Sequence, residues 1–378
     1  MTTKITAISS LRDVSAADWD SCAGNDNPFV SHAFLLALEM SGSATAKTGW
    51  AGQHLILEDN GKIVGVVPCY LKTHSRGEYV FDHGWADAFT RAGGRYYPKL
   101  QVSVPFTPAT GPRLLASTAE HRLALAEGLL TLCEQSKASS VHITFALDAE
   151  AQELQNAGWL LRNDIQFHWH NQGYLSFADF LAQLSSSKRK NIRKEREAVA
   201  RGGITFEHVT GAALTEAHWD HFYAFYMDTG SRKWGDPYLT RKFFSLINQT
   251  MPEKTLLVMA KREGRTIAGA LNFIGKDTLF GRNWGCTENH PFLHFETCYY
   301  QAMDFAISRG LAKVEAGAQG EHKLARGYLP EKTNSLHHLA HPGLARAVAD
   351  YLEQERAAIA QDQDVLGQHS PFRHEEQD

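Results

Sequence analysis

The sequence predicts an α/β protein of two domains, each built on a mainly antiparallel sheet. At 378 residues the chain exceeds the length at which one hydrophobic core usually keeps growing. Two segments, 54–72 and 256–276, share one design: an apolar strand, a polar turn with glycine and a second apolar strand. Their apolar positions coincide when Gly65 is aligned with Gly269, an offset of 204 residues. This repeat indicates two related halves.

The same elements follow each hairpin. The first half continues into a helix at about 119–136 and the strand "SVHITFAL", and the second into a helix at about 295–309 and the strand "LAKVEAGA". Between the halves, a short helix, a Ser-rich cap at 185–187 and a very basic helix precede the stop at Gly202-Gly203. We expect an N-terminal domain at 1–172 and a C-terminal domain at 173–378, which includes the basic helix 188–200.

Composition restricts the class of protein. Lys and Arg total 38 against 42 Asp and Glu, so a polyanion site would have to be local. The chain starts without the apolar core of a signal peptide and has no run of about 18 apolar residues, which predicts a cytoplasmic protein without a membrane span. The five cysteines are widely spaced, and the histidine pairs lack acidic or thiol ligands at a familiar spacing, so no metal site is expected.

One stretch concentrates titratable groups among glycines: "EAGAQGEHKLARGYLP", residues 315–330. A turn explains the glycines, because they adopt backbone angles that side chains forbid. It does not explain an acid, a base and two cations within six residues: Glu321, His322, Lys323 and Arg326.

Six motifs resemble those of one enzyme family. They are "SSSKRKNIRKERE", "GRNWGC", "HFETCYYQAMDFAI", "GAQGEHKLARGYLP", "YVFDHGWADAF" and "YYPKLQVSVPFTPATG". Together they resemble the FemAB-like branch of the GNAT superfamily, and more narrowly bacterial predicted N-acyltransferases of a peptidoglycan-biosynthesis-like branch. The resemblance covers nearly the whole chain. It implies two tandem GNAT-like (acyl-CoA N-acyltransferase) domains and transfer of an acyl or aminoacyl group to an amine.

Such a transfer needs a proton acceptor for the amine and a stabiliser for the carbonyl oxygen, but no nucleophilic side chain. The catalytic candidates are Glu296, His294, Glu321, His322 and Lys323. Lys323, Arg326 and the backbone amides near 317–320 would stabilise the oxyanion or hold a carboxylate. The alternative for this cluster is a surface loop with a salt bridge.

Substrate-binding candidates fall into three groups. In the first half, aromatics and cations would form an acceptor pocket for an anionic group, unless they simply pack between the domains. In the second half, a further group would line the same cleft as Glu296. On the basic helix, Arg189, Arg193 and Arg196 share one face and would contact phosphates, the alternative being a solvated charged face. The first group comprises Lys72, Asp82, Trp85, Tyr97, Lys99 and Arg113, and the second Arg282, Trp284, Tyr300, Gln319 and Arg326.

The donor and the acceptor stay open. A glycine-rich pyrophosphate loop is expected of a CoA-dependent GNAT domain, but "GCTENHPFLHF" has no such pattern, which favours an aminoacyl-tRNA or another activated acid over acyl-CoA as co-substrate. No cofactor is firmly implied. The acceptor would be an amine-bearing small molecule or peptide precursor, and tRNA is a candidate partner. Two alternatives remain: an acyl-CoA-dependent N-acetyltransferase, and a non-catalytic RNA-binding protein with the same fold.

Overall fold

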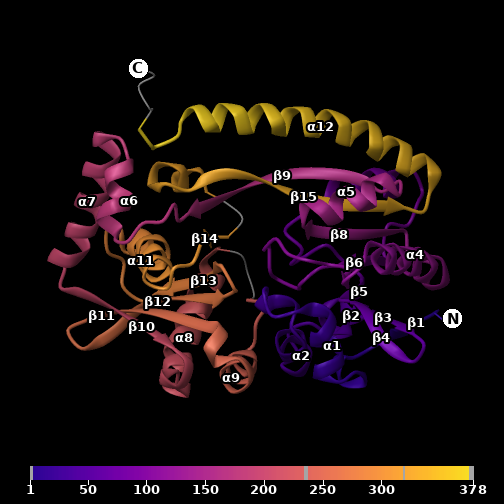
Figure 1. The fold of residues 1–378 in the computed structure, drawn as a ribbon, viewed down its shortest axis with the longest axis horizontal. Coiled ribbons are helices and arrows are strands. Elements are labelled where there is room, and N and C mark those ends of the chain that lie inside the picture. Colours follow the sequence, from indigo (N-terminus) through magenta and orange to yellow (C-terminus); the bar gives the residue numbers. More distant parts are fainter. Residues whose placement is uncertain (1–2, 234–236, 318–319, 374–378) are drawn as a thin grey trace. The chain divides into compact units, whose positions relative to one another are not determined.

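The computed structural model describes residues 3–233, 237–317 and 320–373, and the chain divides into two compact units (Figure 1). Unit 1 comprises 1–165 and 332–362, and unit 2 comprises 166–331 and 363–378. The expected division at residue 172 placed 332–362 in the second domain. These residues join unit 1 because Leu344, Val348 and Leu352 of the long helix α12 pack with Trp85 and Tyr96.

Two strands and one helix contribute residues to both units: β9 (Leu160–His170), β15 (Leu329–Leu339) and α12 (Pro342–Gln368). The other strands of unit 1 are β1 (Thr3–Ile8), β2 (Trp50–Gly52), β3 (His54–Asp59), β4 (Lys62–Val67), β5 (Cys69–Lys72), β6 (Lys99–Val102), β7 (Leu115–Ala116) and β8 (Ser140–Ala146). Its helices are α1 (Ala16–Ala23), α2 (His32–Met40), α3 (His83–Arg91), α4 (Ala119–Ser136) and α5 (Asp148–Asn156).

The strands of unit 2 are β10 (Ile204–Thr210), β11 (Thr255–Arg262), β12 (Arg265–Ile274), β13 (Thr278–Cys286) and β14 (Lys313–Glu315). Its α-helices are α6 (Phe177–Gln183), α7 (Ser186–Arg201), α8 (Glu216–Lys233), α9 (Arg241–Thr250), α10 (Leu293–Phe295) and α11 (Gln301–Ser308). A π-helical turn, Glu296–Tyr300, joins α10 to α11, and a 3-10 helix covers Glu321–Arg326. None of the helices in the described part of the chain has the length and apolar character that a membrane span requires.

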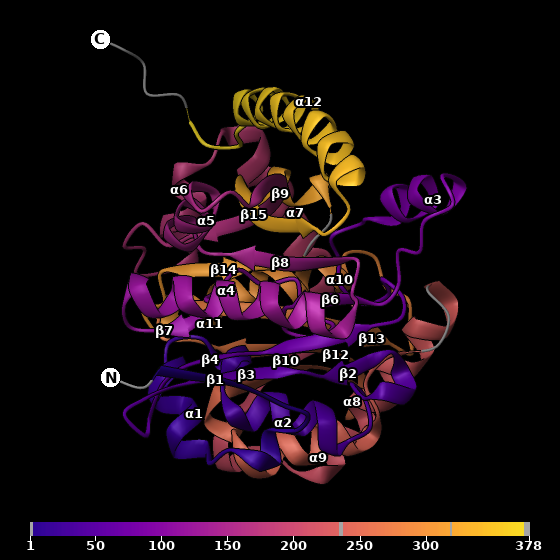
Figure 2. The ribbon, with the colours of Figure 1, turned by 90° about the vertical axis from the view of Figure 1, so that its right-hand side faces the viewer.

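Helices cover both faces of the sheet of unit 1 that contains β1, β3 and β4 (Figure 2). The strand orders are β1-β3-β4-β7 and β15-β8-β6-β5-β2, and most neighbours are antiparallel. Helix α4 packs Leu125 and Leu129 on Leu57, Val102 and other apolar side chains of these strands. Figure 2 shows α4 on one side of β3 and β4, and α1 and α2 on the other.

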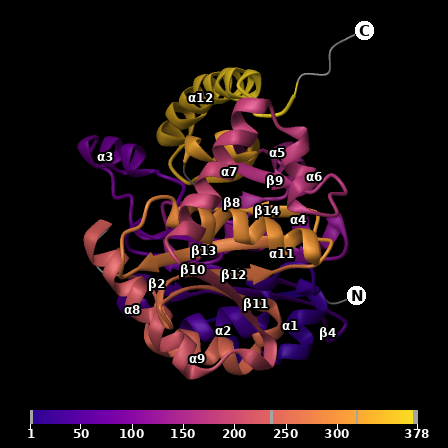
Figure 3. The ribbon, with the colours of Figure 1, turned by 90° about the vertical axis from the view of Figure 1, so that its left-hand side faces the viewer.

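Unit 2 repeats this layering. Its strand order is β10-β11-β12-β13-β14-β9, with β13 and β14 as the parallel pair. Figure 3 shows α11 on one face of the sheet and α8 and α9 on the other. The helix α8 approaches β13 closely because Gly285 has no Cβ, which would lie only 2.2 Å from the Phe225 carbonyl oxygen. The core on the α11 side includes Tyr300, Met303, Val258 and Leu279.

The two predicted hairpins are confirmed, and their turns are alike. Asn60-Gly61 joins β3 to β4, and Glu263-Gly264 joins β11 to β12. All four residues have positive φ, between 50° and 79°, as two-residue turns of the type I′ class require. The predicted helix at 119–136 coincides with α4, and the predicted helix at 295–309 is present but contains the π-helical turn.

Each hairpin also carries one extra residue in its second strand, Val64 in unit 1 and Ile267 in unit 2. Turns and bulges therefore align at an offset of 203 residues, since 264 − 61 and 267 − 64 both equal 203. The expected equivalence of Gly65 with Gly269 is wrong by one residue. The buried residues of both strands follow one another without alternation, at 65–67 and 267–273, so their apolar pattern does not fix the register, whereas the turn does.

Candidate active site

A pocket of about 110 Å³ opens in unit 2 beside an irregularity in the pairing of β12 with β13. Asn272 pairs with Gly281 and Leu271 with Asn283, so Arg282 is the extra residue of a β-bulge. Bulges disrupt the hydrogen-bond ladder locally and re-aim side chains, often next to active sites. The lining residues are Ala270, Leu271, Asn272, Gly281, Arg282, Asn283, Trp284, His294, Cys298, Tyr299 and Ala316. The pocket thus contains three predicted site residues, Arg282, Trp284 and His294.

Aromatic rings form one wall of this pocket. The Trp284 and His294 ring centroids lie 4.9 Å apart, and His294 and Tyr299 lie 5.4 Å apart. Phe295 stacks on Tyr299 at 6.0 Å and lies 5.5 Å from His322. Tyr299 belongs to the π-helical turn, which inserts an extra residue into the helix; such turns are frequent at functional sites.

His322 adjoins this wall and hydrogen-bonds to it. Its Nε2 atom lies 2.8 Å from the Tyr299 hydroxyl. Partial burial, and then the nearby cations of Arg326 and Lys323, lower the pKa of the His322 imidazole below its usual value. The ring is therefore mostly neutral at pH 7, with a nitrogen able to accept a proton.

Lys323 lies beside His322 but points into the protein. Its ammonium is almost completely buried and donates a hydrogen bond of 2.8 Å to the Gly317 carbonyl oxygen. Burial lowers the pKa of Lys323 to about 8, with the neighbouring Cys298 thiol acting in the opposite direction. Lys323 is thus mostly charged at pH 7 and loses its proton as the pH rises through about 8.

Glu296 faces a different environment from His322 and Lys323. Its Oε1 atom accepts hydrogen bonds from Arg196 at 3.0 Å and from Gln301 at 2.8 Å. Burial raises the pKa of the Glu296 carboxyl, and Arg196 offsets part of this effect. Glu296 is therefore paired with α7 and does not line the pocket.

Arg326 and Tyr300 meet at a second carboxylate. Glu195 of α7 accepts from Arg326 Nη2 at 2.7 Å and from the Tyr300 hydroxyl. Arg326 also lies flat over the Phe295 ring, 3.4 Å from its centroid, while Tyr300 is fully buried. The structure thus brings His294, His322, Lys323, Arg282 and Trp284 to or beside the pocket, whereas Glu296 and Arg326 form ion pairs with α7 and Tyr300 donates a hydrogen bond to Glu195. Gln319 and the side chain of Glu321 lie outside the described residues.

The basic helix α7 has an exposed and a buried face. Lys190, Arg193 and Lys194 are exposed and Arg189 is half-buried, while Ile192 is in the core. Amphipathic placement keeps these cations available to a ligand. The expected third member of this face, Arg196, instead points inward and pairs with Glu296 and Asp304.

In unit 1, the predicted pocket residues are gathered but buried and paired with one another. Lys99 Nζ donates to Glu78 at 2.6 Å and to Asp82, and Lys72 lies 3.8 Å from Glu78 and 3.5 Å over the Trp50 ring. Two carboxylates balance the two ammonium groups, and burial lowers the pKa of Lys72 to about 7. This balance weakens the expectation of a site for an anionic group.

The other three predicted residues of unit 1 have structural contacts. Tyr97 hydrogen-bonds Ser75 at 2.9 Å, and Trp85 packs edge-on against His337. The Arg113 guanidinium is buried and donates to backbone carbonyls of Thr144, Ala109 and Pro112. Arg113 therefore holds loops in place.

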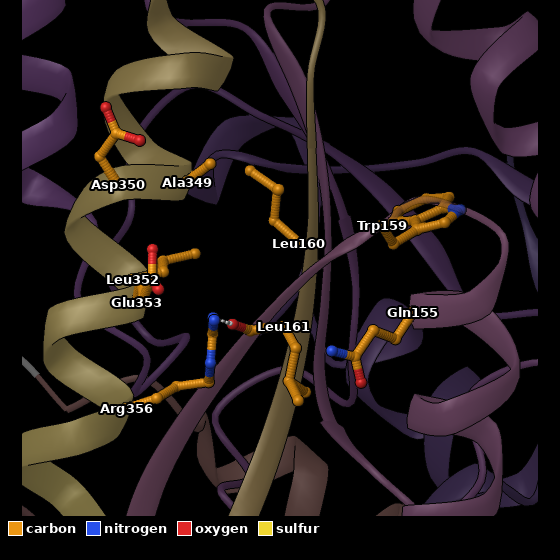
Figure 4. A pocket seen from close by; sticks show the side chains of 9 residues that line it. All are labelled: Gln155, Trp159, Leu160, Leu161, Ala349, Asp350, Leu352, Glu353 and Arg356. Carbon is orange, nitrogen blue, oxygen red and sulfur yellow. Dashed lines mark hydrogen bonds between the residues drawn. The ribbon is translucent and has the colours of Figure 1, made fainter.

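Two hollows of unit 1 are larger than the pocket of unit 2 but are lined by fewer groups that could act in catalysis. One, of about 260 Å³, lies between α12, β9 and α5 and is drawn in Figure 4. Arg356 lines this hollow, and its guanidinium donates a hydrogen bond of 2.6 Å to the Leu161 carbonyl oxygen. The other, of about 300 Å³, lies between α4 and the strands β1 and β3 and is mainly apolar. Neither contains a histidine, a lysine or a cysteine.

Four residues of the site were not among the sequence-predicted site residues: Asn272, Cys298, Tyr299 and Glu195. Asn272 is a buried amide within an apolar strand, and Glu195 is an acid within a run of cations, so each interrupts its local pattern. These interruptions of the local pattern are the sequence signals that could have identified the two residues. Cys298 and Tyr299 carry none, because a thiol and an aromatic ring at helical spacing usually indicate core packing.

The two layered units with mainly antiparallel sheets define a protein of the tandem GNAT-like fold class, as the sequence predicted. The chain belongs to the FemAB-like family, whose model, described as peptidoglycan biosynthesis/recognition, matches residues 10–374. No curated protein matches the chain.

Solved structures share the fold at low sequence identity. FemX superposes with a TM-score of 0.57 at 12% identity, covering 89% of this chain and 98% of that chain. L-PGS from Bacillus licheniformis superposes with a TM-score of 0.51 at 10% identity, covering 92% and 98%. At these identities the likeness concerns the fold alone.

Proposed function

We propose that this protein is an N-acyltransferase that moves an activated acyl or aminoacyl group, with aminoacyl-tRNA as the favoured donor, to an amine acceptor in the pocket of unit 2. Membership of the FemAB-like family supports this class of reaction. The observation that carries the proposal is the pair His322 and Lys323 beside the aromatic wall, a neutral imidazole next to a cation with a pKa of about 8.

The proposed reaction is direct attack. The acceptor nitrogen forms a bond to the carbonyl carbon of the ester while His322 takes the proton of the amine. The carbonyl oxygen gains negative charge, which the positive charge of the Lys323 ammonium stabilises without direct contact, because that ammonium is buried and bonded to the Gly317 carbonyl oxygen. The bond to the ribose oxygen then breaks, and that oxygen receives the proton that His322 took from the amine, which restores the neutral imidazole. No covalent acyl-enzyme is required.

Two features favour aminoacyl-tRNA as donor. The segment between β13 and α10, residues 287–292, contains no glycine, so it lacks the loop that would hold the pyrophosphate of CoA. The exposed cations of α7 suit a phosphate backbone. The acceptor is proposed to be an amine-bearing small molecule or peptide precursor.

The test supplies both donor classes in parallel. The purified protein is incubated with a pool of tRNA charged with isotope-labelled amino acids, or with acyl-CoAs, and a protein-free bacterial extract as acceptor source. Mass spectrometry then detects labelled amides. Product from charged tRNA supports the proposal, product from acyl-CoA alone indicates the CoA-dependent alternative, and RNA binding without any product indicates the non-catalytic one.

A further inference from the structure

Helix α7 presents two consecutive residues to the interior of unit 2. Glu195 and Arg196 point inward, while Lys190, Arg193 and Lys194 are exposed. The inward pair has opposite charges and makes separate sets of contacts. The basic helix is therefore also a structural support for the elements beneath it.

Glu195 connects three elements through one carboxylate. Its Oε2 atom accepts from the Tyr300 hydroxyl on the π-helical turn and from Arg326 Nε at 3.2 Å, and its Oε1 accepts from Arg326 Nη2 at 2.7 Å. The side chains are 13% exposed for Glu195 and 10% for Arg326. A bidentate pair so little exposed to solvent fixes the orientation of the guanidinium.

Arg326 in turn contacts two residues beside the pocket, His322 and Phe295. Its Nη1 atom donates to the His322 carbonyl oxygen at 2.8 Å, and its guanidinium covers the Phe295 ring. Phe295 in turn stacks on Tyr299, whose hydroxyl bonds the His322 imidazole. His322 is thus held at its backbone and at its ring by groups that Arg326 touches, and Arg326 is held by Glu195.

We infer that Glu195 is a positioning residue for acyl transfer, acting through Arg326 to fix His322 and the aromatic wall of the pocket. This inference rests on the proposed function of the pocket. Loss of the carboxylate charge leaves Arg326 without its partner in a largely buried place, so the guanidinium is expected to reorient toward solvent. His322 would then lose its support while remaining chemically intact.

The test compares Glu195→Gln with Glu197→Gln, an exposed glutamate on the same helix. For Glu195→Gln we expect kcat to fall about 10- to 100-fold, as for a small misplacement of reacting groups. The KM for the donor should stay within about threefold, because the cations that bind it are unchanged. Combining Glu195→Gln with Arg326→Gln should add little to either single change, since both break one pair. Glu197→Gln should behave as wild type.

A second readout does not depend on turnover. Cys298 lines the pocket between Phe295 and Tyr299, so the rate of its alkylation by N-ethylmaleimide, followed by peptide mass spectrometry, reports the geometry of the wall. We expect the alkylation rate of Cys298 in Glu195→Gln to differ about fivefold from the wild-type rate, and the rate in Glu197→Gln to equal it. If wild type proves inactive with every donor, the proposed function fails while the alkylation rates still decide the positioning role. Wild-type kcat and wild-type alkylation in a folded Glu195→Gln variant would overturn the inference.

Discussion

The Tyr299 hydroxyl and the His322 Nε2 atom lie 2.8 Å apart, which joins the π-helical turn to the 3-10 helix that follows β14. In the neutral imidazole, the tautomer with the proton on Nε2 donates to the Tyr299 oxygen and leaves Nδ1 as the proton acceptor, which is the tautomer that the proposed transfer requires. Proton release from the acceptor amine requires such a group near the reacting carbonyl.

Replacing His322 by Gln tests this role. Glutamine keeps a hydrogen bond to Tyr299 but does not take up a proton, so turnover should fall by roughly 10²-fold while the melting temperature changes little. The matched control is His290→Gln, because His290 pairs with Glu288 by a 2.8 Å contact away from the lining of the pocket. Equal turnover in the two variants would exclude His322 as the proton acceptor.

The pH dependence of transfer should have two limbs. The acceptor His322 must be neutral, so the rate should rise as pH passes its pKa, which lies below the ordinary value of about 6.5. The oxyanion stabiliser Lys323 must be charged, so the rate should fall as pH rises through about 8. Lys323→Met should have a lower maximum rate and no alkaline limb, measured as kcat from pH 5.5 to 9.5. An alkaline limb that persists in this variant assigns it to another group.

Lys323 should also affect stability in a defined pH window. Its pKa is about 8 in the folded protein and about 10.4 when unfolded, so the unfolded chain binds more protons between these values. The free energy of unfolding should therefore rise with pH across that window in wild type, by up to about 3 kcal/mol from this group. Denaturant unfolding at pH 7.5, 9 and 10.5 should show a smaller rise in Lys323→Met. Identical pH slopes would mean that the lysine is not buried as a cation.

The exposed face of α7 should bind phosphates. Changing Arg189 and Arg193 to Ala together should weaken binding of tRNA and reduce the slope of log K against log salt by about 1.4 to 1.8, because each cation releases roughly one counterion. Fluorescence anisotropy with labelled tRNA at 50 to 300 mM salt measures this slope. The control is Lys4→Ala with Lys62→Ala, two exposed lysines of unit 1. The same slope in both double variants would show that α7 is a solvated helix.

The sequence predicted the fold because turns, caps and hydrophobic periodicity are local signals. The hairpins around Gly61 and Gly264, and the helix α4, follow from such signals. The offset between the halves was misjudged by one residue, since strands buried on both faces do not fix their register.

The candidate site was predictable only in part. His322 and Lys323 stood out as titratable groups among glycines, and His294 and Trp284 came from the family resemblance. Sequence does not determine which of several nearby charges pair with each other. Glu296 with Arg196, and Lys99 with Glu78, therefore emerged only from packing.

The most direct test of the central claim is a double-mutant cycle on the rate of a single turnover from charged tRNA to the acceptor amine. Wild type is compared with His322→Gln, Lys323→Met and the double variant, with the donor at a concentration well above its Kd. We predict losses of roughly 10²-fold for each single change and a smaller loss in the double variant than their product, because both groups act on the same transition state. Rates within about threefold of wild type in all three variants would contradict the assignment of the transfer site to this pocket.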